Sequence, residues 1–254
     1  EHSLRLLERM QGMGVKGLYM TPHIIHGAYD NRGEEELRQR FADFGYQGPL
    51  DIRLGAEYFI DDKFPEHLEG NPLTMNCRHV LVEFSINGYS LRAFDMLFEA
   101  TLSGYEIILA HPERYAFVQA NGKDKVINLI KQYKLQLNLL SLAGYHGSGA
   151  KKYAEQMLRQ GLYTFVGTDT HSNAYLDALQ RARISKKVFD AVNVLKENNR
   201  TLNLGISYSM GGRLNSRVSE VVMHGPYFSA VGYDKVVDRQ YRSDFRLPDI
   251  FRGG

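Results

Sequence analysis

Six short apolar runs recur between residues 14 and 200, and helix-like stretches separate most of them. The runs cover residues 15–23, 51–59, 79–85, 105–113, 135–144 and 163–171. Strands that alternate with helices are typical of βα units, which build a parallel sheet in an α/β fold. Because several runs are apolar throughout, we expect helices on both faces of the sheet. Six successive units without a glycine-rich dinucleotide or P-loop motif favour a closed barrel over an open doubly wound sheet.

Three of the intervening helices can be placed from their apolar spacing. Ser90 is a suitable N-cap for a helix that presents one apolar stripe. A second helix spans about residues 150–160, and Gly161 is its expected C-terminal stop. The longest predicted helix covers about residues 174–198. Its inward-facing residues are Leu176, Leu179, Ala182, Val188, Val192 and Leu195.

Both ends of the chain depart from the βα pattern. Residues 4–10 have the spacing of an amphipathic helix, and we expect a further element upstream for it to pack against. After residue 203 the sequence is rich in Gly, Ser, Arg and Tyr and has no sustained helical period. We therefore predict one domain over residues 1–203 and an appendage over 204–254, with short strands at 219–225 and 229–237.

Composition excludes several classes of protein. The net charge is +2, from 31 basic and 29 acidic residues, which gives no electrostatic reason to expect a nucleic-acid or membrane partner. No apolar run approaches the roughly 20 residues that span a bilayer. A single cysteine, Cys77, cannot form an internal disulfide and indicates a reducing compartment, so we expect a cytoplasmic protein.

Metal-ligand side chains end five of the six apolar runs. They are His23, Glu57, Glu83, His111, Asp169 and His171. In a parallel barrel the carboxyl ends of the strands meet at one mouth, so these imidazoles and carboxylates should converge. Such a mixture suits Mn, Fe or Zn, and a bridging carboxylate would allow two or three metal ions in one site. A buried salt-bridge network is the structural alternative for this set.

The segments around these residues resemble a known family. TPH, GAE, VE, AHPERY, QLNLLSLAG and GTDTH, in this order and spacing, are similar to the metal-dependent protein-tyrosine phosphatases of bacterial capsule and exopolysaccharide loci, within the polymerase-and-histidinol-phosphatase (PHP) superfamily. The resemblance covers about residues 1–200. It implies a distorted (β/α)7 barrel with a trinuclear site that usually works with manganese. The family's first strand carries an HxH motif that has no counterpart here, so we expect a barrel lacking its first strand.

The resemblance also implies roles and a mechanism. The six strand-end residues match metal ligands, and Arg114 matches an arginine that holds the substrate phosphate. A metal-activated water would attack phosphorus in line with the tyrosyl oxygen, and His23 or His171 could assist as a catalytic acid. The expected substrate is a tyrosine-phosphorylated protein, such as a tyrosine autokinase of polysaccharide export. A cysteine-based mechanism is excluded, because the arginine it needs six positions after Cys77 is Glu83.

Two other functions stay open on the sequence alone, as does the oligomeric state. The same scaffold could hydrolyse a small phosphomonoester such as histidinol phosphate. It could also be a catalytically dead module that binds phosphotyrosine.

Some residues close to the predicted ligands allow two interpretations. Tyr29, Tyr58 and Tyr115 could wall a phosphotyrosine pocket, or they could pack at the barrel rim. Residues 144–150 could bind phosphate through backbone N–H groups, or they could simply connect a strand to a helix. His79 is out of register with the strand-end set and is expected to pack.

Overall fold

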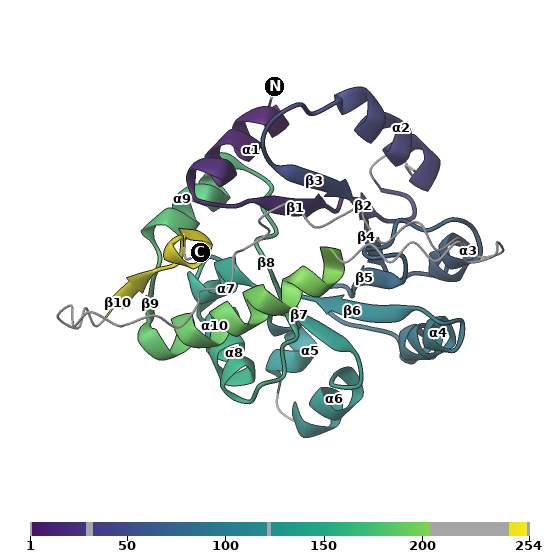
Figure 1. Cartoon of the computed structure of the whole chain (residues 1–254). Helices are drawn as coiled ribbons and strands as arrows, with labels where there is room; N and C mark the ends of the chain where they lie inside the picture. Colours follow the sequence, from purple (N-terminus) through teal and green to yellow (C-terminus); the bar gives the residue numbers. More distant parts are fainter. Residues whose placement is uncertain (1, 29–32, 121–122, 204–243, 253–254) are drawn as a thin grey trace, which may run out of the picture.

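The computed structural model describes residues 2–28, 33–120, 123–203 and 244–252. Its main feature is a six-stranded sheet in which strand order follows chain order, as Figure 1 shows. The strands are β2 (His23–Ile24), β4 (Glu57–Phe59), β5 (His79–Glu83), β6 (Glu106–Ala110), β7 (Lys134–Asn138) and β8 (Phe165–Gly167). Every neighbouring pair is parallel, which confirms the predicted α/β class. Closure into a distorted (β/α)7 barrel stays a prediction, because no described strand joins β2 to β8.

The first two predicted strands are each interrupted. β1 (Gly17–Met20) pairs with β3 (Asp51–Leu54) in a separate parallel ladder. The register is the same in both ladders, because Met20 lies opposite Leu54 and His23 lies opposite Glu57. Pro22 has no N–H to donate and breaks the first run just before His23. The interruption leaves the register intact and brings His23 level with Glu57.

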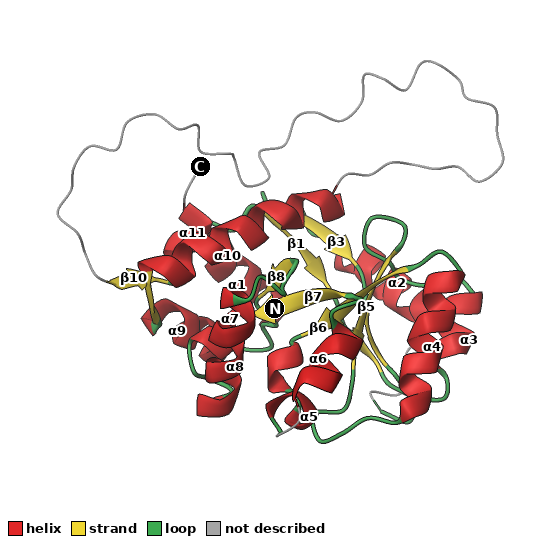
Figure 2. Ribbon diagram, turned by 90° about the horizontal axis from the view of Figure 1, so that it is seen from below, coloured by secondary structure: helices red, strands yellow, loops and turns green. Residues whose placement is uncertain are grey.

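Helices surround the sheet, as Figure 2 shows. They are α1 (His2–Gly12), α2 (Glu34–Phe44), α3 (Phe64–Glu69), α4 (Leu91–Leu102), α5 (Ala116–Gln119), α6 (Lys123–Ile130), α7 (Leu139–Leu142), α8 (Gly147–Arg159), α9 (Asn173–Arg181), α10 (Lys186–Asn199) and α11 (Asp249–Arg252), with short 3-10 turns η2 (Pro112–Arg114) and η3 (Arg200–Asn203). Ser90 caps α4 as expected, because its side chain accepts from the Ala93 N–H. Val80, Leu81 and Val82 of β5 are all buried, which confirms that this strand is covered on both faces. Over the described residues, no helix combines the length and apolar character needed to cross a bilayer.

The single helix predicted over residues 174–198 is wrong. The chain leaves α9 at Ala182, which is extended, and forms β9 (Arg183–Ser185) before α10 begins. The Ser185 side chain then accepts from the Val188 N–H and starts a second helix. The apolar spacing concealed this break, because Leu179 before it and Val192 after it both face the core.

The break is stabilised by a distant segment. β10 (Asp244–Arg246) pairs antiparallel with β9, and the following Leu247 and Ile250 are buried against the body of the fold. The last described residues of the predicted appendage therefore pack on the domain. The strands predicted at 219–225 and 229–237 lie outside the described residues.

Candidate metal centre

All six predicted strand-end residues lie in one connected cluster at the carboxyl ends of the parallel strands. His23 and Glu57 face each other across the β2–β4 ladder. Glu83 ends β5 and His111 directly follows β6. Asp169 and His171 follow β8. The parallel topology thus brings together residues that are far apart in the sequence, as the strand-end pattern predicted.

Two carboxylates lie between two imidazoles at the centre of the cluster. The His23 Nδ1 atom is 2.9 Å from Glu83 Oε1 and 3.9 Å from Glu57 Oε2. On the other side, His111 Nε2 is 3.0 Å from Glu57 Oε1 and 3.5 Å from Glu83 Oε2. Each carboxylate therefore presents one oxygen to each imidazole. Ligand atoms of His23, Glu57 and Glu83 all lie within 4.8 Å of one another, which is the spacing that a shared cation requires.

The second half of the cluster leads to Arg114. The Nε2 atoms of His171 and His23 lie 3.2 Å apart, and the Nδ1 atom of His171 is 2.9 Å from the Asp169 carbonyl. The Asp169 Oδ2 atom accepts from Arg114 Nη1 at 2.8 Å and from Asn138 Nδ2 at 3.0 Å. The guanidinium predicted to bind phosphate therefore lies against one of the predicted metal ligands.

Two of the six residues have strained backbones. His111 has a φ of 35° and Asp169 a φ of 48°, in the left-handed region that favours glycine. Such strain costs roughly 1–3 kcal/mol and persists where the surrounding structure enforces it, often at functional sites. Here each residue stands where a parallel strand ends, and the sharp turn directs its side chain into the cluster. The strained backbone at these two positions thus helps to bring the predicted ligands together.

The ionisation of the cluster reflects an excess of carboxylate. Burial lowers the pKa of His23, but the hydrogen bond to Glu83 and the charges of Glu57 and Glu83 outweigh it and raise the pKa to about 9. His111 is more deeply buried, yet its bond to Glu57 also raises its pKa. Burial raises the pKa of Glu83, but its contacts with His23 and His111 outweigh it and lower the pKa.

These residues fit divalent cations. The protons on the two imidazoles supply positive charge where a metal would supply it, and the Nδ1 atom of His111 is buried without a hydrogen-bond partner among the described residues. Neutral imidazole with carboxylate is a donor set that Mn, Fe and Zn accept. The predicted ligand roles stay predictions. Among the described residues, His23, Glu57 and Glu83 have ligand atoms close enough together to share a cation.

Asn138 was not among the predicted site residues. It ends β7, its Oδ1 atom accepts from the Leu140 N–H at 2.9 Å, and its Nδ2 atom donates to Asp169. Asn138 ends β7, but the fifth apolar run continues to residue 144, so the sequence did not mark Asn138 as a strand end, and an amide is a less conspicuous ligand type. Behind it lies Glu113, whose carboxylate accepts from the Asn138 N–H at 3.0 Å and from the Tyr163 hydroxyl at 2.9 Å. Burial raises the pKa of the Glu113 carboxyl group. Its hydrogen bond from the Asn138 N–H fixes the end of β7.

Two of the three tyrosines suggested as pocket walls face the core instead. Tyr58 and Tyr115 are fully buried. The Tyr58 hydroxyl accepts from the Leu73 N–H at 2.8 Å, and the Tyr115 hydroxyl donates to the Ala110 carbonyl at 2.7 Å. The packing alternative is therefore correct for both, while Tyr29 lies outside the described residues. Residues 144–150 form the turn into α8 and its first residues.

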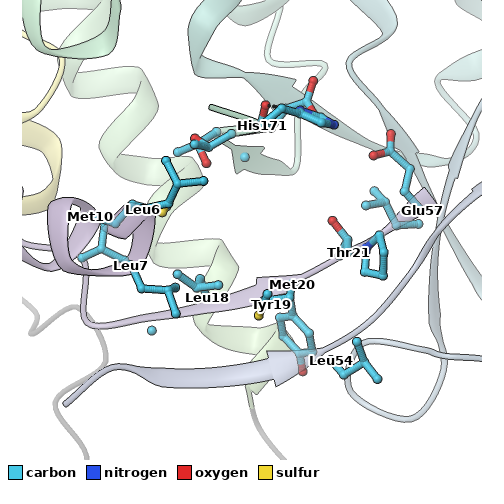
Figure 3. Close-up of a pocket in the computed structure, with 18 of the residues that line it drawn as sticks. Leu6, Leu7, Met10, Leu18, Tyr19, Met20, Thr21, Leu54, Glu57 and His171 are labelled. Carbon is cyan, nitrogen blue, oxygen red and sulfur yellow. Dashed lines mark hydrogen bonds and ion pairs between the residues drawn. The ribbon is translucent and has the colours of Figure 1, made fainter. Parts of the chain in front are cut away.

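A cavity of about 730 Å³ opens from one side of the cluster. In Figure 3, Glu57 and His171 lie at its polar end, and Leu6, Leu7 and Met10 of α1 lie at its apolar end. It lies between β1 and β8. The outer edge of β8 is occupied by a side chain, because Asn199 accepts from the Val166 N–H at 3.1 Å and donates to the Val166 carbonyl at 2.7 Å.

Several known proteins are similar to this chain in sequence. CapC of Staphylococcus aureus is 28% identical over 179 residues, which are 67% of this chain and 69% of that protein. The tyrosine-protein phosphatase YwqE of Bacillus subtilis is 24% identical over 178 residues, with the same coverage. The tyrosine-protein phosphatase CpsB of Streptococcus agalactiae is 26% identical over 185 residues, which are 68% of this chain and 75% of that protein.

A solved structure supports the same relationship at the level of the fold. It comes from the crystal structures of YwqE from Bacillus subtilis and CpsB from Streptococcus pneumoniae, described as metal-dependent tyrosine phosphatases. The TM-score is 0.62 at 22% identity, over 80% of this chain and 87% of that one. Residues 1–194 match the family described as capsular polysaccharide synthesis, CpsB/CapC. The chain therefore belongs to the CpsB/CapC family.

Proposed function

We propose that this chain is a metal-dependent protein-tyrosine phosphatase that acts in capsular or exopolysaccharide synthesis. The observation that carries the proposal is the pair of carboxylates, Glu57 and Glu83, that each face both His23 and His111, with Arg114 held nearby through Asp169. Membership of the CpsB/CapC family supports the reaction class, since the relatives YwqE and CpsB are named tyrosine-protein phosphatases.

The six cluster residues would hold the metal ions. We assign His23, Glu57, Glu83, His111, Asp169 and His171 as ligands of two or three divalent cations. Manganese is the expected metal, with iron or zinc as alternatives that the same donors accept. Bound cations would supply the Lewis acidity that activates water and neutralises charge on the phosphoryl oxygens.

Arg114 would bind and orient the phosphate. Its guanidinium is a planar fork that can contact two phosphoryl oxygens at once, and such contacts strengthen as charge develops in the transition state. The Arg114 side chain is 23% exposed, so the fork is accessible to substrate. Asp169 and the neighbouring Asn138 fix its position before substrate arrives.

The proton on the leaving group can come from the exposed side of the cluster. His171 is half exposed and lies beside His23. Whichever of the two imidazoles is not fully committed to a metal ion could donate to the departing tyrosyl oxygen. The reaction needs only a weak general acid, because tyrosine has an unperturbed pKa of about 10 and its phenolate leaves more easily than an alkoxide.

Membership of the family supports a proposal for the biological substrate. We propose a tyrosine-phosphorylated protein, and specifically a tyrosine autokinase of polysaccharide export, met in the cytoplasm. Control of polysaccharide synthesis would be the outcome of its dephosphorylation.

The test is manganese-dependent hydrolysis of a phosphotyrosine peptide by the wild type and by His111→Ala, beside a small aliphatic phosphate. We expect hydrolysis that needs both manganese and His111. His79→Ala is the matched control, because it removes a buried imidazole at the other end of the sheet. Equal activity in wild type and His111→Ala would contradict the proposed site. Faster turnover of the aliphatic phosphate would contradict the proposed substrate.

A further inference from the structure

Three aromatic side chains that the mechanism does not use line one side of the metal centre. Tyr145 and His146 belong to the turn between α7 and α8, and Tyr175 lies in the first turn of α9. The ring centroids of Tyr145 and Tyr175 are 4.7 Å apart, and those of Tyr145 and His146 are 5.4 Å apart. The ring of Tyr175 also lies 5.6 Å from that of His171, a proposed metal ligand. We call Tyr145, His146 and Tyr175 the aromatic wall.

The aromatic wall begins next to the ion pair of Arg114 and Asp169. The Nε2 atom of His146 lies 3.3 Å from Asn138 Nδ2, which also donates to Asp169, the carboxylate that holds Arg114. Burial and then the charge of Arg114 lower the pKa of His146 to about 4, so its imidazole is neutral at pH 7. A neutral ring beside Arg114 adds no competing positive charge and offers an apolar face. A group attached to phosphate at Arg114 would therefore have aromatic surface within reach.

The aromatic wall is accessible from solvent. Tyr145 is 44% exposed, although it is a large aromatic residue that would normally be more buried. A phosphotyrosine is the side chain of a polypeptide, so its ring must reach the metal centre from outside the protein. The 730 Å³ cavity is a poorer candidate for the ring, because Arg114 is not among its lining residues. The aromatic wall is thus the better-placed apolar surface.

The position of Tyr175 is held by contacts on both sides of it along α9. The Arg9 guanidinium donates to Asn173 Oδ1 at 2.7 Å and to Asp177 Oδ1 at 2.6 Å, which ties α9 to α1. These contacts fix the helix that carries Tyr175, so less conformational entropy is lost when its ring binds a ligand.

We propose that the aromatic wall receives the phenyl ring of phosphotyrosine and sets a preference for aryl over alkyl phosphomonoesters. The proposal deepens the proposed function and rests on it for the reaction. Aromatic rings attract one another in offset and edge-to-face arrangements, a contribution that an alkyl phosphate cannot obtain. The aromatic wall would therefore distinguish phosphotyrosine from phosphoserine, while Arg114 and the metal centre bind the phosphate of either.

The kinetic test compares Tyr175→Leu and Tyr145→Leu with wild type on a phosphotyrosine peptide and on a phosphoserine peptide of the same sequence. We expect kcat/KM for phosphotyrosine to fall roughly threefold to tenfold relative to kcat/KM for phosphoserine in each variant. Tyr105→Leu is the matched control, because Tyr105 lies just before β6, at the opposite end of the sheet from the metal centre. An unchanged ratio of the two substrates in both variants would overturn the proposal. Should Tyr175→Leu fail to fold, the exposed Tyr145 carries the test alone.

A binding measurement separates this proposal from the proposed function. Phenylphosphonate and methylphosphonate, which are not hydrolysed, are titrated calorimetrically into the manganese-loaded protein. We expect tighter binding of phenylphosphonate by wild type and Tyr175→Phe, and a loss of that preference in Tyr175→Leu. Equal binding of both phosphonates by wild type would overturn the aromatic wall as a ring subsite. A wild type that prefers phenylphosphonate but hydrolyses no phosphopeptide would refute the proposed function alone.

Discussion

The two ends of the parallel sheet use the same residue types in opposite ways. At the amino ends of β5, β6 and β7, the carboxylate of Glu106 lies 3.1 Å from His79 Nε2, 3.1 Å from Lys134 Nζ and 2.6 Å from Arg78 Nη2. One carboxylate there meets two permanent cations and one imidazole. Burial lowers the pKa of His79 more than Glu106 raises it, so this imidazole stays neutral.

At the carboxyl ends the balance is reversed. The cluster holds three carboxylates, Glu57, Glu83 and Asp169. Among the described residues its one permanent cation is Arg114, which pairs with Asp169. The imidazole of His23 then has to carry a proton, with its pKa raised to about 9. The two ends therefore differ in the balance of carboxylates and permanent cations, and this balance distinguishes a salt-bridge network from a candidate metal centre. The amino end is satisfied by its own side chains, while the carboxyl end has room for additional positive charge.

The largest expected effect comes from removing one bridging carboxylate. Glu57→Gln keeps the size of the side chain but removes a proposed metal ligand. We expect kcat/KM for a phosphotyrosine peptide to fall by about 10³-fold, because metal ions carry most of the charge stabilisation. Glu106→Gln makes the same change at the other end of the sheet and should leave kcat/KM nearly unchanged. Similar losses in both variants would contradict the distinction between the two ends.

The next effect concerns the single arginine of the cluster. Arg114→Lys keeps the positive charge but loses the planar fork, so phosphate would be held by one contact in place of two. We expect kcat/KM to fall by about 10²-fold, as when one preorganised donor is removed from a catalytic site. Steady-state kinetics at saturating manganese measures it. Arg78→Lys is the control at the amino end, and a loss as large there would count against a substrate contact for Arg114.

A smaller effect is expected from pH on the apparent affinity for manganese. Because the folded, metal-free protein holds His23 protonated up to about pH 9, a cation that binds to it must displace that proton. The apparent affinity for manganese should therefore rise about tenfold for each pH unit between pH 6 and 8, and the raised pKa of His111 would steepen the slope. Calorimetric titrations in buffers of different ionisation enthalpy would report the released proton. A flat profile would show that His23 is not a ligand.

The smallest effect is on stability at the amino end. Glu106→Gln removes ion pairs that are partly exposed, and each such pair contributes little. We expect the free energy of unfolding of the metal-free protein to fall by about 1 kcal/mol, measured by urea denaturation. The affinity for manganese should not change. A weaker affinity in this variant would mean that the two ends of the sheet are coupled.

Most of the sheet and its cluster could be predicted from sequence because both follow from local patterns. Apolar runs mark buried parallel strands, and the topology carries the residues at their ends to one edge. His23, Glu57 and His111 were found in this way. Asn138 was missed because the apolar run continues past it to residue 144, although the strand itself ends there, and because a single amide does not stand out.

The features that could not be predicted depend on contacts between distant segments. The break between α9 and α10 is stabilised by pairing of Arg183–Ser185 with Asp244–Arg246, which apolar spacing cannot reveal. The aromatic wall joins Tyr145 to Tyr175, from two turns that are adjacent only in the folded chain. The tyrosines next to ligands in the sequence, Tyr58 and Tyr115, point to the core instead.

The most direct test of the account is a calorimetric titration of manganese into the metal-free protein at pH 7.5, with wild type, Glu83→Gln and Glu106→Gln compared. We predict saturable binding with proton release in wild type and Glu106→Gln, and binding at least about tenfold weaker in Glu83→Gln. Equal affinity in all three proteins would contradict the assignment of a metal centre, since the carboxylates at the carboxyl ends of the strands would then be no more than another salt-bridge network.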